Sequence, residues 1–167
     1  FYRWLQEHMP RLLAREEAAP AEAIERSCAI KAAVVAADER EGGIRAILNF
    51  GHTFGHAIET GQGYGQWLHG EAVATGMLLA LELSARRGWV AASEVDDFRE
   101  LLLGMHLPVH TPAGMDAAAF LALMSRDKKV IDGRLRLVLL KDIGAACIVD
   151  DATERELGEL FQGAARG

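Results

Sequence analysis

The stretch of residues 45–71, RAILNFGHTFGHAIETGQGYGQWLHGE, contains three of the chain's six histidines, among polar residues that a buried core rarely holds. His52 and His56 are four residues apart, so on a helix both side chains project from one face, which is the geometry of a chelating pair. We predict this helix over residues 45–59, with Arg45 on the same face as His52. The stretch therefore predicts a helix that presents two imidazoles and a guanidinium together.

His69 follows a glycine-rich loop, at the expected start of the next helix. Neutral imidazoles bind zinc well, and a catalytic zinc keeps one position open beside three protein ligands. The alternative is three core histidines that bond to backbone carbonyls. The clustering of the three, with Arg45, Asn49 and Glu71 close in sequence, favours a metal site over that alternative.

Helical spacing of apolar residues along the rest of the chain predicts a mainly α fold, a helical bundle with one small β-hairpin. Pro10 is expected to break or restart the first helix, and Ser93, Asp116 and Thr153 resemble helix N-caps. The helices are expected over residues 1–15, from about 20, 45–59, 69–87, 94–103, 116–125 and 154–165. The hairpin is expected from residues 134–140 and 147–149.

The composition is that of an ordinary globular domain, and we treat residues 1–167 as one domain. The formal net charge of −6 and the lack of a basic stripe argue against nucleic-acid binding, and no apolar run is long enough for a membrane span. Cys28 and Cys147 form no metal-binding or disulfide pattern, so we expect a cytoplasmic protein. Because Phe1 opens directly into an amphipathic pattern, we expect the chain to begin inside a helix.

The chain resembles 3-dehydroquinate synthase over nearly its whole length. The resemblance rests on long motifs without gaps. They are KAAVVAADEREGGIR at 31–45, NFGHTFGHAIE at 49–59, YGQWLHGEAVATGM at 64–77 and SRDKK at 125–129. The matched part of the family is its helical metal- and substrate-binding domain, and no glycine-rich dinucleotide fingerprint occurs here.

The resemblance implies roles for individual residues. Two metal ligands fall on His52 and His69, with a third ligand, a glutamate, upstream of Phe1; this corrects the local pairing of His52 with His56. His56 matches a histidine that contacts substrate and assists proton transfer. Lys31, Arg45 and Asn49 match positions that bind the substrate, and we count them with His56 as catalytic. One of Lys128 and Lys129 matches a further substrate-binding lysine. Weaker candidates for orienting the histidines are Glu41 and Glu71.

The activity implied is conversion of 3-deoxy-D-arabino-heptulosonate 7-phosphate to 3-dehydroquinate and phosphate in the shikimate pathway. The implied cofactors are NAD, held mainly by an absent N-terminal α/β domain, and zinc, cobalt or another divalent metal. A homodimer is expected, and the chain alone is expected to be inactive. A related sugar-phosphate cyclase, a metal-dependent polyol dehydrogenase and a non-catalytic association module remain alternatives. For the last, Trp4, Leu5 and Leu12 could form an exposed face or ordinary core.

Overall fold

The computed structural model describes residues 1–39, 43–63, 65–125, 130–131 and 134–164. The chain divides into two compact units, Phe1–Leu48 and Asn49–Gly167, which are described separately below. The single-domain expectation stays a prediction. No helix among the described residues combines the length and the apolar character that crossing a membrane requires.

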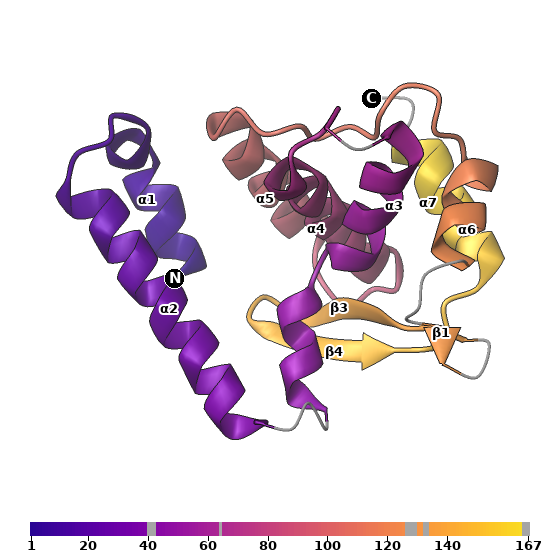
Figure 1. The fold of residues 1–167 in the computed structure, drawn as a ribbon, viewed down its shortest axis with the longest axis horizontal. Coiled ribbons are helices and arrows are strands. Elements are labelled where there is room, and N and C mark those ends of the chain that lie inside the picture. The colour runs from indigo at the N-terminus through magenta and orange to yellow at the C-terminus, as the bar shows by residue number, and fades with distance from the viewer. Residues whose placement is uncertain (40–42, 64, 126–129, 132–133, 165–167) are drawn as a thin grey trace. The chain divides into compact units, whose positions relative to one another are not determined.

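The structure is mainly helical, as predicted, with small antiparallel strand pairs (Figure 1). The helices are α1 (Tyr2–Leu13), α2 (Ala18–Ala37), the 3₁₀ helix η1 (Ile44–Asn49), α3 (His52–Gln62), α4 (His69–Arg86), α5 (Ala92–Gly104), α6 (Ala117–Ser125) and α7 (Glu154–Ala164). The strands are β1 (Val130–Ile131), β2 (Arg134–Leu135), β3 (Leu137–Asp142) and β4 (Ala145–Val149).

In the first unit, α1 and α2 pack against each other. The predicted break at Pro10 is wrong, because α1 continues through it to Leu13. Pro10 is exposed, so water can solvate the carbonyl that loses its amide partner, and the Ala14 amide still bonds to the Pro10 carbonyl at 3.0 Å. Trp4 stacks on His8 with ring centroids 4.4 Å apart. The three apolar residues expected at an exposed or core face, Trp4, Leu5 and Leu12, are half-buried.

In the second unit, α4 is the buried central helix that its small residues predict, and it packs against α3, α5, α7 and β3. The core beside it contains an aromatic cluster. Phe161 stacks on Phe120 with centroids 4.2 Å apart and meets Phe54 edge-on at 6.0 Å. The Ser84 hydroxyl accepts a hydrogen bond from the Leu140 amide at 3.0 Å, which ties α4 to β3. This core holds α4 in place, and with it the start of the helix at His69.

The predicted hairpin is confirmed as β3 and β4, which pair in register from Leu137 opposite Val149 and turn at Gly144, where φ is +87°. Its first strand begins three residues later than expected. The residues before it form a second antiparallel pair, β1 with β2, that the sequence did not predict. Two-residue strands are too short to show an alternating pattern.

Helix starts were predicted with mixed success. The Asp116 carboxylate accepts a hydrogen bond from the Ala119 amide at 2.8 Å, as an N-cap should. Thr153 and Glu156 form the expected reciprocal capping box at the start of α7. Ser93 is not a cap, because Ala91, with an extended backbone, is the N-cap and α5 begins at Ala92.

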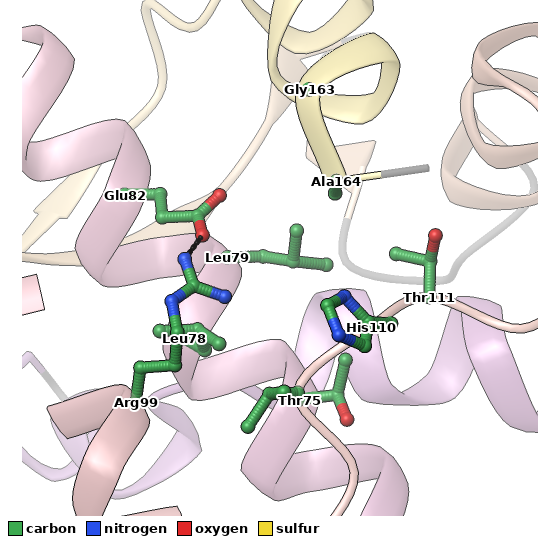
Figure 2. A pocket seen from close by; sticks show the side chains of 10 residues that line it. Thr75, Leu78, Leu79, Glu82, Arg99, His110, Thr111, Gly163 and Ala164 are labelled. Carbon is green, nitrogen blue, oxygen red and sulfur yellow. Dashed lines mark hydrogen bonds and ion pairs between the residues drawn. The ribbon is translucent and has the colours of Figure 1, made fainter. Parts of the chain in front are cut away.

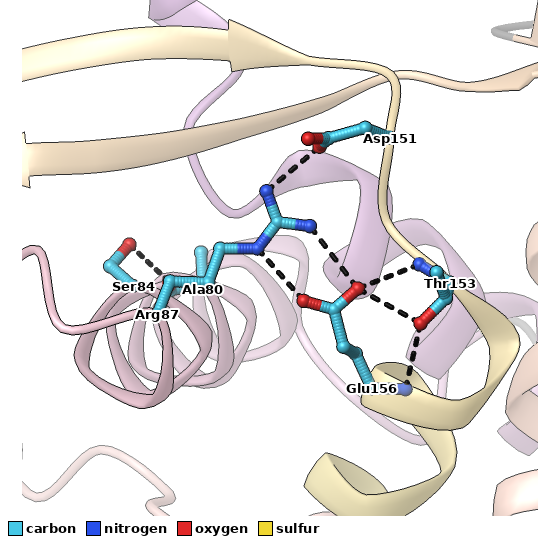
Figure 3. Close-up of polar contacts among 6 residues, drawn as sticks. All are labelled: Ala80, Ser84, Arg87, Asp151, Thr153 and Glu156. Carbon is cyan, nitrogen blue, oxygen red and sulfur yellow. Dashed lines mark hydrogen bonds and ion pairs between the residues drawn. The ribbon is translucent and has the colours of Figure 1, made fainter.

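Arg87 joins α4 to the start of α7, and its side chain is only 11% exposed (Figure 3). Its guanidinium donates to Asp151 at 2.8 Å and to the two Glu156 oxygens at 3.1 and 3.3 Å. The Thr153 amide and hydroxyl also donate to Glu156. Together with Arg87 they hold the pKa of the Glu156 carboxyl below its usual range.

We expect the Glu156 contribution to stability to depend on pH. Since its pKa is lowered in the folded state, the contribution is present at neutral pH and is lost as the pH falls below about 5 and through the folded-state pKa. Glu156→Gln should therefore lower the free energy of unfolding at pH 7 and have much less effect at pH 3. Urea unfolding at both values tests this, with the exposed Glu159→Gln on the same helix as control. An equal loss at both values would contradict the expectation.

Candidate metal and substrate site

The predicted helix over residues 45–59 is wrong as one continuous element. The chain forms η1 up to Asn49, and α3 then begins at His52 after Gly51, whose φ is +79° in the left-handed region. The predicted face shared by Arg45 and His52 therefore does not exist, because no single helix carries both. The break starts α3 directly at His52.

Three glycines let α3 and α4 approach at backbone distance. A Cβ on Gly76 of α4 would overlap the Gly51 carbonyl oxygen and lie 2.8 Å from the Gly55 nitrogen. A Cβ on Gly55 would lie 3.1 Å from the Ala72 carbonyl group, and one on Gly51 would lie 2.6 Å from the Met77 nitrogen. We call Gly51, Gly55 and Gly76 the glycine seam. It explains why Gly55 stands beside His56 despite a cost of about 1 kcal/mol for glycine in a helix.

The glycine seam brings the three sequence-predicted histidines together. His52 and His56 lie on α3 one turn apart, as predicted, with ring centroids 5.8 Å apart, and His69 begins α4. The His69 ring lies 5.5 Å from that of His52 and 6.2 Å from that of His56, centroid to centroid. His52 and His56 are half-buried and His69 is exposed, so the cluster opens to solvent.

Glu59 is a site residue that the sequence reasoning missed. Its carboxylate oxygens lie 3.2 and 3.3 Å from Nδ1 of His69. Glu71, which was expected to orient a histidine, instead accepts a hydrogen bond from the Leu68 amide at 2.9 Å and caps α4. The sequence carries one signal for Glu59, because it follows His56 by three residues and so shares the histidine face of α3.

Within the described part of the chain, no group of three or more histidine, cysteine, aspartate or glutamate side chains is placed to hold a metal ion. The donors still suit zinc, because two or three imidazoles open to solvent beside a carboxylate are ligands that zinc accepts. The chemistry of the cluster therefore agrees with the expectation that His52 and His69 are two ligands of a metal whose further ligand lies elsewhere.

The predicted substrate-binding residues are distributed over both units. Asn49 is exposed and lies three residues before His52 in the sequence. Lys31 is exposed on α2, and Arg45 is half-buried in η1. The Asp38 carboxylate accepts hydrogen bonds from the amides of Gly43 and Arg45 at 2.7 and 3.0 Å, which ties α2 to η1. Outside the described residues lie Glu41, Lys128 and Lys129.

A separate cavity of about 290 Å³ lies between α4, α5 and the end of α7 (Figure 2). Leu78, Leu79 and Val109 are apolar lining residues, and the Arg99 guanidinium pairs with the Glu82 carboxylate at 2.5 Å. Because these two charges neutralise each other, the cavity offers little for an anionic substrate. The histidine cluster is the better candidate site.

Two solved structures of synthases share this fold. The 2-epi-5-epi-valiolone synthase of Streptomyces hygroscopicus, solved with NAD+ and Zn2+, is similar over 98% of this chain and 45% of its own, with a TM-score of 0.85 and 25% identity. A 2-deoxy-scyllo-inosose synthase, solved with carbaglucose-6-phosphate, NAD+ and Co2+, is similar over 74% of this chain and 36% of its own, with a TM-score of 0.63 and 24% identity. The fold is therefore that of the helical part of these synthases.

Sequence comparison narrows this class. The model of the family described as 3-dehydroquinate synthase C-terminal matches residues 1–130. The 3-dehydroquinate synthase of Nitrosococcus oceani is 61% identical to this chain over 90% of its length, and that of Teredinibacter turnerae is 56% identical over 97%. The chain belongs to the 3-dehydroquinate synthase C-terminal family. It spans 42% and 45% of the length of these two relatives.

Proposed function

We propose that this chain is the metal- and substrate-binding part of a 3-dehydroquinate synthase. In that role it serves the conversion of 3-deoxy-D-arabino-heptulosonate 7-phosphate to 3-dehydroquinate and phosphate. The observation that carries the proposal is the histidine cluster, built by the glycine seam within motifs that match this family. We also propose a homodimer, on the resemblance, and a cytoplasmic location, on the cysteine pattern.

The metal proposed here is zinc or another divalent ion held by His52 and His69, with a further ligand from outside the chain. When bound, such an ion polarises a substrate hydroxyl and so favours its oxidation. NAD is proposed to bind mainly to a preceding α/β domain. The structural relatives support both cofactors, because they were solved with NAD+ and with Zn2+ or Co2+.

The residues of this chain bind the substrate and move its protons. His56 lies within 6.2 Å of His69, centroid to centroid, so it can reach a substrate held at the metal and take or return a proton there. Lys31 and Arg45, with one of Lys128 and Lys129, are proposed to hold the phosphate and carboxylate as fixed cations. Asn49 is proposed to hydrogen-bond a substrate hydroxyl.

A related sugar-phosphate cyclase is the second candidate, and the structural similarity to 2-epi-5-epi-valiolone synthase favours it. The sequence favours the first proposal, because identity is 56–61% to the 3-dehydroquinate synthases and 25% to that enzyme. A substrate that carries both a carboxylate and a phosphate also makes better use of the proposed cations.

Phosphate release by the full-length enzyme that contains this chain tests the proposal. We expect turnover of 3-deoxy-D-arabino-heptulosonate 7-phosphate, and at least about 100-fold lower kcat/KM for a sugar phosphate without the carboxylate, because the cation that would hold it is left unpaired. Equal rates on both substrates would contradict the assignment in favour of a different cyclase. The chain alone is expected to release no phosphate.

A further inference from the structure

The contact between Glu59 and His69 joins the end of α3 to the start of α4. Both carboxylate oxygens of Glu59 lie within 3.3 Å of Nδ1 of His69. The Glu59 side chain is 21% exposed and that of His69 is 58% exposed. The carboxylate is therefore sheltered, while most of the imidazole ring faces solvent.

An ionised carboxylate can only accept hydrogen bonds, so Nδ1 of His69 must carry the proton in this contact. In a neutral ring the lone pair is then on Nε2, which is the nitrogen available to a metal. From this geometry we infer that Glu59 is a positioning residue, which fixes the tautomer and orientation of His69 so that Nε2 serves as the ligand. The presence of a metal at His69 rests on the proposed function, whereas the contact of Glu59 with His69 is observed in the structure.

The surroundings explain why Glu59 takes this role. Its neighbour Ile58 is fully buried, and the glycine seam sets the distance between α3 and α4, so the Glu59 backbone has little freedom to move. Glu71, which is closer to His69 in sequence, is occupied by the Leu68 amide. A carboxylate behind a metal-bound imidazole also increases the basicity of the ligand, and removing such a partner costs 10–100-fold in metal affinity.

The first experiment determines the tautomer of His69 in the metal-free chain by long-range ¹H–¹⁵N correlation, at about pH 8, where an ordinary imidazole is neutral. Comparison with a His69→Gln spectrum assigns the signals. We expect the Nδ1–H form in the unchanged chain, the same form in Glu59→Gln, whose amide oxygen can still accept, and loss of this preference in Glu59→Ala. An Nε2–H form in the unchanged chain would overturn the inference.

The second experiment makes the same substitutions in the full-length enzyme, because a further metal ligand is proposed to lie outside this chain, and titrates each metal-free protein with Zn2+ by calorimetry. Glu59→Ala should weaken binding by about 10–100-fold and Glu59→Gln by less, while Glu159→Ala, an exposed control on α7, should change it little. Unchanged affinity in Glu59→Ala would overturn the positioning role even if the tautomer is as expected. No binding by the unchanged full-length enzyme, with His69 in the Nδ1–H form, would count against the metal proposal and would uphold the tautomer part of the inference.

Discussion

Gly76→Ala is expected to destabilise the second unit by about 3 kcal/mol, the upper part of the usual range for overpacking. The added Cβ would overlap the Gly51 carbonyl oxygen and approach the Gly55 nitrogen at 2.8 Å. Both are backbone atoms, so no rotamer change can relieve the overlap and α3 must move away from α4. Urea unfolding of the purified chain measures the loss.

Gly158→Ala is the matched control, because Gly158 lies inside α7 and a Cβ added there would meet no atom within 4 Å. Alanine is favoured over glycine in a helix, so this variant should be more stable by about 0.5–1 kcal/mol. The two substitutions make the same chemical change, and only the surroundings differ. A Gly76→Ala variant as stable as the unchanged chain would show that the two helices do not meet at backbone distance.

His69→Ala is expected to weaken zinc binding by about 100-fold, or ~2.7 kcal/mol, whereas His56→Ala should change it by less than about threefold. The ring distances alone do not show whether His69 or His56 binds the metal together with His52. The His52 ring centroid lies 5.5 Å from that of His69 and 5.8 Å from that of His56. The Glu59 carboxylate behind His69 would strengthen that imidazole as a ligand, and the resemblance assigns His56 to the substrate instead. Calorimetric titration of each variant measures the affinities.

Two further variants complete this test. His52→Ala should abolish binding whichever histidine is its partner, and His110→Ala, an exposed histidine at the separate cavity, should leave binding unchanged. If His56→Ala weakens binding as much as His69→Ala does, the metal uses the pair suggested by helical spacing alone, and the roles implied by the resemblance are wrong.

Most helices could be predicted because their signals are local. The small residues of α4 identified it as a buried central helix, and the Thr153 capping box identified the start of α7. The break at Gly51 could not be predicted in the same way. Gly51 lies against Val73, Gly76 and Met77 of another helix, and spacing along one segment contains no information about such a partner.

The same distinction applies to the site. His52, His56 and His69 stood out in the sequence because three histidines in one short stretch are unusual, and the structure brings all three together. Glu59 was missed because its contact with His69 crosses the loop between two helices. Conversely, Glu71 was correctly seen as close to His69, but its position in the first turn of α4 commits it to the backbone.

The glycine seam also limits how the site can move. Side chains at a helix interface can change rotamer and let one helix slide past the other, but a contact of backbone on backbone has no such adjustable part. His52 and His69 are each the first residue of a helix joined at that contact, so their Cα separation is fixed by the main chain. Any opening or closing of the site would therefore carry both helices as one rigid body.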